Sequence, residues 1–99
     1  MIRLLIPLLA LVLPAAAEEP DRAALQVLAA PCANCHGPDG QSPGAIPSIA
    51  GLPADEAAAK MLAFRDGQDP AATVMPRLMK GYDEAQIRAL AQWFEKVKQ

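Results

Sequence analysis

The sequence predicts an all-α domain in which three main helices are joined by long loops. Apolar residues recur at helical spacing in three segments, 20–30, 54–65 and 83–98. The connections between these segments are rich in glycine and proline, which interrupt both helices and central strands. Because strand-like alternation of apolar and polar residues persists nowhere in the chain, no sheet is predicted.

The first predicted helix begins at Pro20, a residue suited to a first helical turn, and places Leu25 and Leu28 on one face. Pro31 is expected to end or kink this helix just before the first cysteine, because a proline disfavours helical backbone in the residue that precedes it. The loop that follows, 37–53, is about 17 residues long. A loop of that length in a small domain is unusual unless it surrounds a functional site.

The other two predicted helices have clear end signals. Gly67 follows the second one as a stop signal, and the stretch from there to Tyr82 is expected to be irregular. Asp83 is suited to the N-cap of the third helix, and Gln86, three residues later, completes a capping box. Tyr82, which precedes the N-cap, is placed to pack on Ile87.

The first 17 residues, MIRLLIPLLALVLPAAA, have the layout of a secretory signal peptide (1–17), with a positive charge at Arg3, an apolar run, and small residues before an expected cleavage after Ala17. The apolar run is shorter than the roughly 20 residues that a membrane-spanning helix needs. No cysteine follows the cleavage site to carry a lipid. We therefore expect residues 18–99 to form a single domain that is exported to the periplasm without a membrane anchor.

Removal of Arg3 leaves eight Lys and Arg against eleven Asp and Glu, a formal charge of −3. No basic patch indicates nucleic-acid binding. Aromatic residues make up only 4% of the chain, and domains of this size often need a staple or a bound group to complete their core.

The stretch CANCH contains both cysteines, Cys32 and Cys35, and the only histidine, His36. In an exported chain this spacing allows three interpretations: a small-loop disulfide, a thioredoxin-like redox pair, or covalent attachment of haem c. A thioredoxin-like pair would need a sheet, which is not predicted. Haem attachment also explains the histidine, since two thioether bonds would fix one edge of the porphyrin and an imidazole nitrogen could then bind the iron. We expect one covalent haem and retain the disulfide as the alternative.

A low-spin electron carrier needs a second axial ligand, and a methionine sulfur in that position raises the reduction potential. Outside the leader the candidates are Met61, Met75 and Met79. Met61 lies within the second predicted helix beside Leu62 and Phe64, a position typical of core packing. Met75 and Met79 both lie in the irregular stretch before the third helix, and their spacing does not separate them.

Four blocks, in the order CANCHGPDG, IPSIAGLP, AFRDGQ and TVMPRLMKGYDEAQIRALAQWF, resemble the successive blocks of small class I c-type cytochromes. The likeness extends from about residue 22 to residue 97. AFRDG followed by TVM-x-R-x-x-KGY resembles most specifically the monohaem cytochrome subunits of flavocytochrome c sulfide dehydrogenase. The resemblance implies a small class I cytochrome c fold, with three main helices wrapped around one covalently bound haem.

The resemblance also implies roles for single residues. The methionine of the TVM block is the family's distal ligand, so Met75 is the expected axial partner of His36. Met79 is kept as a second choice and is expected to pack in the core. In similar cytochromes a backbone carbonyl accepts the ring N–H of the proximal histidine, and the matching carbonyl here is that of Pro47.

Two further expectations follow from the family's fold. The first and last helices should cross where Ala24 or a neighbouring alanine meets Trp93 or Phe94. The haem propionates need donors, for which Arg77, two residues after Met75, is the best placed of four candidates, Arg65, Arg77, Lys80 and Tyr82.

We expect an electron-transfer protein without catalytic residues, because an iron with both axial positions filled binds no substrate. The resemblance implies a FAD-containing partner subunit that oxidises sulfide or a related sulfur species. A free periplasmic shuttle to an oxidase, reductase or photosynthetic centre is the first alternative. A haem sensor or catalyst with an open sixth iron position is the second.

Overall fold

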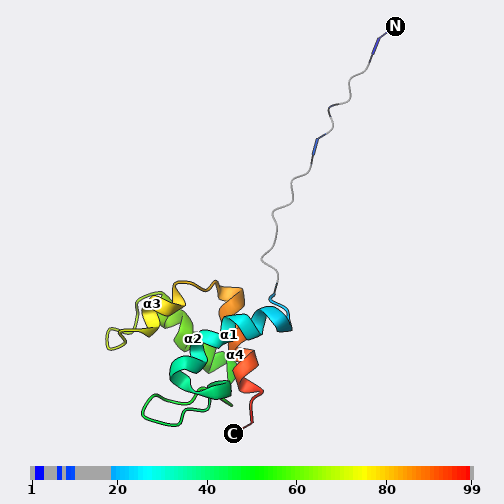
Figure 1. Cartoon of the computed structure of the whole chain (residues 1–99). Coiled ribbons are helices and arrows are strands. Elements are labelled where there is room, and N and C mark those ends of the chain that lie inside the picture. The colour runs from blue at the N-terminus through cyan, green and yellow to red at the C-terminus, as the bar shows by residue number, and fades with distance from the viewer. Residues whose placement is uncertain (1, 4–6, 8, 11–18, 99) are drawn as a thin grey trace.

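The computed structural model describes residues 2–3, 7, 9–10 and 19–98, so most of the predicted signal peptide, including its expected cleavage site, lies outside the described residues. Within these ranges the regular secondary structure is entirely helical, which confirms the all-α prediction. Figure 1 shows the helices, which are α1 (Arg22–His36), the 3-10 helix η1 (Pro38–Gly40), α2 (Ala54–Arg65), α3 (Met75–Met79) and α4 (Glu84–Glu95). None of the described helices has the length and apolar character needed to cross a membrane.

Helix α1 continues through Pro31 to His36, so the proline does not end it before the first cysteine, which was one of the two expected outcomes. A proline inside a helix removes one backbone hydrogen bond and costs about 3 kcal/mol. Here the proline is exposed, whereas Ala29 and Cys32 on either side of it pack in a cluster with Phe94 of α4. Burial of these neighbours offsets the local cost of the proline and keeps the segment helical.

Helix α2 has the predicted bounds and ends at the predicted glycine. Gly67 adopts a φ of +71°, which a glycine reaches without strain. Its N–H donates to the Phe64 carbonyl at 3.2 Å, and the Gln68 N–H donates to the Ala63 carbonyl at 2.9 Å. This pair of bonds is a Schellman motif, which satisfies carbonyls that the end of the helix would otherwise leave unpaired.

Helix α4 begins with the predicted capping box. The Asp83 side chain accepts the Gln86 N–H at 2.8 Å, and the Gln86 side chain accepts the Asp83 N–H at 2.9 Å. The helix ends at Glu95 rather than extending to residue 98. The Glu95 carboxylate accepts the Ala54 N–H at 2.5 Å and so caps the start of α2, where proline precedes the helix and offers no side-chain cap.

The stretch between α2 and α4, predicted to be irregular, contains the short helix α3. A proline in its first turn suits a helix start, because the missing N–H has no helical partner there. Met75 and Met79 are four residues apart in this helix and therefore lie on the same side of it.

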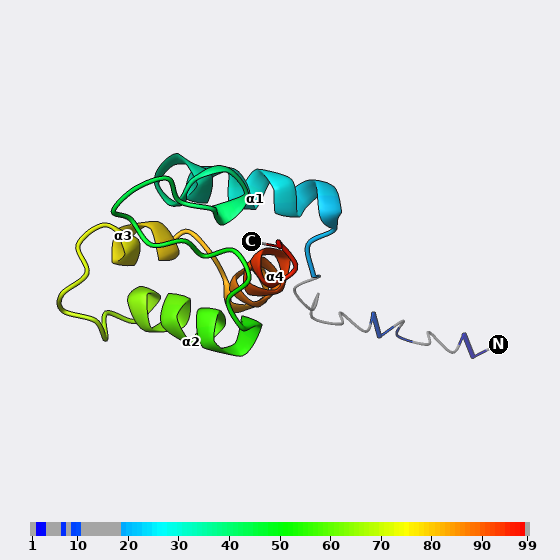
Figure 2. The same ribbon diagram turned by 90° about the horizontal axis from the view of Figure 1, so that it is seen from below.

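Helix α4 is the central element of the packing. Helix α2 packs against α3 and α4, and α1 packs against α4 and η1. Figure 2 shows α1 and α2 on opposite sides of the molecule, with α3 and α4 between them. The predicted contact between the first and last helices is made by Ala29, which clusters with Leu90 and Phe94, whereas Ala24 is exposed.

The core consists of two clusters of buried residues. One contains Ala58, Met79, Ile87 and Ala91 and lies between α2, α3 and α4. The other contains Ala29, Leu90 and Phe94 and lies between α1 and α4. Met61 and Tyr82 are half-buried and pack against both clusters, so they connect the two sides of the core.

Candidate functional site

The three residues of the CANCH motif lie in the last turns of α1. Cys32, Cys35 and His36 occupy positions i, i+3 and i+4, so they share one face of the helix. Cys32 is half-buried and Cys35 is exposed, and no disulfide joins them. Burial raises the pKa of the Cys32 thiol. The helix therefore presents two separate thiols and an imidazole side by side.

The ring of His36 is held by the predicted hydrogen bond. Its Nδ1–H donates to the carbonyl oxygen of Pro47 at 2.6 Å. With Nδ1 carrying the proton, Nε2 has its lone pair free for a metal. A bond of this kind fixes the orientation of the imidazole and makes it a stronger donor.

The loop that carries Pro47 is closed on itself by hydrogen bonds. The Gly40 carbonyl accepts the Ile49 N–H at 2.8 Å, and the Ser48 hydroxyl accepts the Ser42 N–H at 2.8 Å. Both bonds join residues before Pro47 to residues after it, so the position of its carbonyl is defined by the loop. This closure explains how a segment rich in glycine and proline can hold one acceptor opposite His36.

The three candidate methionines differ in burial. Met79 is 3% exposed and belongs to the core cluster with Ile87, which confirms that it packs in the core. Met75, one turn earlier on the same side of α3, is half-buried and packs at the edge of that cluster. Met61 is half-buried between the two clusters. Among these residues, Met75 combines partial exposure with a position on a short helix that follows a long connection.

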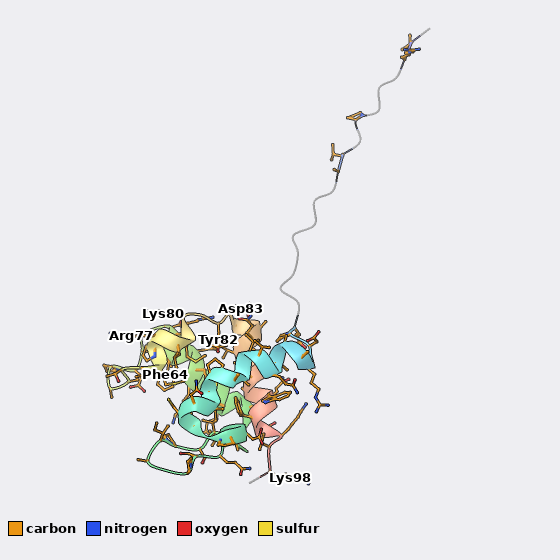
Figure 3. All side chains as sticks on the ribbon, viewed as in Figure 1. Phe64, Arg77, Lys80, Tyr82, Asp83 and Lys98 are labelled. Carbon is orange, nitrogen blue, oxygen red and sulfur yellow. The ribbon has the colours of Figure 1, made fainter. Side chains whose placement is uncertain are left out.

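The cationic residues considered for the propionates lie near α3. Figure 3 shows Arg77 and Lys80 at this end of the molecule, and both are exposed. The Arg65 Nε lies 3.4 Å from the Asp66 carboxylate, an exposed pair that contributes little stability.

Tyr82 has a partner that the sequence did not indicate. Its hydroxyl donates to the Leu28 carbonyl of α1 at 2.9 Å, so this group is already engaged within the protein. Burial raises the pKa of Tyr82. The position of Tyr82 before the N-cap predicted that its ring packs on α4. Nothing in the sequence pattern indicated a hydrogen-bond partner 54 residues away in the chain.

A surface hollow of about 470 Å³ lies between the start of α1 and the end of α4 and is lined by Leu25, Trp93 and Val97, among others. None of the haem-site residues predicted from the sequence lines it. The hollow is therefore separate from the site built around CANCH.

Comparison with known proteins decides the family. Residues 22–98 match the family "Cytochrome c". The chain belongs to the cytochrome c family. This cytochrome is also 38% identical over 69 residues to the cytochrome subunit of sulfide dehydrogenase from Chlorobaculum tepidum. That match covers 70% of this chain and 62% of the relative, so the chain spans less than two thirds of that protein's length.

The cytochrome carries covalently bound haem c and acts as an electron carrier. The donor set fits the group, since α1 presents two cysteines that no disulfide joins and an imidazole on one face. The bond to Pro47 would leave the Nε2 atom of His36 available to a metal.

Proposed function

We propose that this cytochrome is the electron-transfer subunit of a periplasmic sulfide dehydrogenase and accepts electrons from a FAD-containing partner. The similarity to the cytochrome subunit from Chlorobaculum tepidum supports the assignment. So do the AFRDG and TVM-x-R-x-x-KGY blocks, which are the parts of the sequence most specific to such subunits. Residues 1–17, as a signal peptide cleaved after Ala17, direct the domain 18–99 to the periplasm.

In this proposal Cys32 and Cys35 carry the two thioether bonds, and His36 and Met75 are the axial ligands. The haem, when bound, supplies a one-electron ferric/ferrous couple. The protein holds the imidazole through the Pro47 carbonyl and brings Met75 from a separate helix. With both axial positions filled by side chains, the protein itself catalyses no bond-making.

Arg77 is the proposed donor to a haem propionate. It is exposed at the end of the molecule where α3 lies, two residues from Met75, and its guanidinium would be available to a propionate. Its loss should lower the reduction potential, because a cation beside a propionate disfavours the additional positive charge of ferric iron.

The observation that carries the site assignment is the 2.6 Å bond between His36 and Pro47 on a helix that also bears both thiols. The direct test compares Met75→Ala with the matched variant Met79→Ala in the exported, haem-containing protein. Met75→Ala should abolish the weak ferric charge-transfer band that marks methionine–iron ligation, and Met79→Ala should retain it. Loss of the band only in Met79→Ala would instead assign Met79, and absence of a covalent haemochrome would reject the site.

The partner is tested separately from the haem site. A tagged copy of the chain, expressed with its signal peptide in its own host, should co-purify with a flavoprotein, and sulfide should reduce the haem in that complex. Purification as a single chain that sulfide does not reduce, with the methionine band intact, would favour a free shuttle. A sensor or catalyst with an open sixth position is excluded if the methionine band is present.

A further inference from the structure

Tyr82 lies where the helix with Met75 joins the central helix. Its backbone N–H donates to the Met79 carbonyl at 3.2 Å, so it is bonded to the end of α3. The next residue, Asp83, is the N-cap of α4. The backbone on both sides of Tyr82 is therefore hydrogen-bonded, which defines the position from which its side chain extends.

The side chain of Tyr82 reaches from this junction to the helix that bears the CANCH motif. The Leu28 carbonyl, which accepts the Tyr82 hydroxyl at 2.9 Å, lies one helical turn before Cys32. The bond is partly buried, which protects it from competition with water. The ring packs against both core clusters, as does Met61, but only the tyrosine adds a directional bond to α1.

The two proposed axial ligands belong to segments that pack against different neighbours. Helix α1, with His36, packs against α4 and η1, whereas α3, with Met75, packs against α2. The distance between His36 and Met75 therefore depends on contacts that connect α1 with α3. The Tyr82 hydroxyl forms such a link between the end of α3 and α1.

We infer that Tyr82 is a positioning residue that holds the Met75 side of the haem site against the Cys32–His36 side. The inference rests on the proposed role of Met75 as an axial ligand. Without the hydroxyl, the Met75 end of α3 is held less firmly to α1, while the retained ring still packs against both clusters. The methionine should then leave the iron more often, in a step separate from global unfolding.

The test uses Tyr82→Phe in the haem-containing protein, because this change removes the hydroxyl and keeps the ring. Loss of one such bond should raise the population of the methionine-dissociated ferric form roughly 5- to 10-fold under mild denaturant. The ferric charge-transfer band reports ligation, and far-UV circular dichroism reports helix unfolding. In the variant the band should disappear at a clearly lower denaturant concentration than the helical signal.

Asp83→Ala is the matched control. It removes the N-cap of α4 at the neighbouring residue, which lowers global stability, but it leaves the Tyr82 hydroxyl in place. In this control the band and the helical signal should shift together. If Tyr82→Phe behaves in the same way, with both signals shifting together, Tyr82 contributes only to global stability and the inference is wrong.

Native-state hydrogen exchange tests the link without a variant. In the wild-type protein the amides of α3 and of the last turns of α1 should open in one step, with the same dependence on denaturant. Independent opening of the two segments would overturn the inference. If the ferric charge-transfer band is still present in Met75→Ala, Met75 is not the ligand. That outcome would reject the proposed site, and it is distinguishable from the Tyr82→Phe and hydrogen-exchange results.

Discussion

Replacing Gly40 with alanine should destabilise the loop that carries Pro47. Gly40 has a φ of +77°, and a Cβ placed on it would lie 2.8 Å from the Ile49 Cγ1 atom and 2.9 Å from the Phe94 Cδ1 atom. The same residue provides the carbonyl that accepts the Ile49 N–H. The side chain would therefore enter the contact that closes the loop on α4.

Two independent terms set the magnitude. A left-handed conformation at a residue with a Cβ costs about 1–2 kcal/mol. An extra methyl group in a well-packed contact costs about 1–3 kcal/mol, because its neighbours must shift. Together they predict a loss of about 2–5 kcal/mol in the free energy of unfolding, a large part of the about 5–15 kcal/mol typical of a small domain.

Guanidinium unfolding of the haem-containing protein, followed by circular dichroism, measures this loss. Gly44→Ala is the control in the same loop, because a Cβ at Gly44 meets no atom within 4 Å and the residue does not have a positive φ. The control should change stability by less than about 1 kcal/mol. Equal unfolding midpoints for the two variants would refute the assignment of a steric and conformational requirement to Gly40.

Three further outcomes are expected. Met79→Ala should lower the free energy of unfolding by about 2–5 kcal/mol, because Met79 is 3% exposed; a loss below about 1 kcal/mol in denaturant titration would contradict its core position. Pro31→Ala should raise the free energy of unfolding by up to about 3 kcal/mol, and with it the thermal midpoint, since the new N–H can form the missing hydrogen bond inside α1. A lower midpoint would show that the proline is required. Burial raises the pKa of Tyr82 above its usual value of 10.0, so its contribution to stability is full below pH 10 and is lost as the pH rises through the raised pKa. As the pH is raised beyond 10, the unfolding midpoint should therefore decrease in the wild type and decrease less in Tyr82→Phe. Tyrosinate absorbance reports the ionisation of this single tyrosine directly. An equal decrease in both proteins would exclude Tyr82 as its source.

The features that could be predicted from the local pattern alone depend on residues within one turn, whereas the His36–Pro47 bond and the contact between the first and last helices were expected only from the resemblance to class I cytochromes. Asp83 and Gln86 form the predicted capping box, and Gly67 ends α2 as predicted, because each cap involves only nearby backbone groups. Cys32, Cys35 and His36 share a face for a similar reason, since the motif lies in continuous helix.

The features that could not be predicted depend on distant contacts. Pro31 is an interior helical residue because neighbouring side chains pack on α4, which overrides local propensity. The partner of the Tyr82 hydroxyl comes from a segment 54 residues earlier. Met75 and Met79 lie in the same connection between α2 and α4, and their difference in burial arises only when α3 packs against α2.

The contact between α1 and α4 brings together the first and last helices of the domain. During synthesis the chain emerges from its N-terminus, so α1 is complete long before the residues it packs against exist. Until Phe94 has been made, Ala29 and Cys32 have no core to enter. Both cysteines of the exported chain therefore stay accessible until α4 packs on α1, so the proposed thioether bonds would form before the fold closes over Cys32.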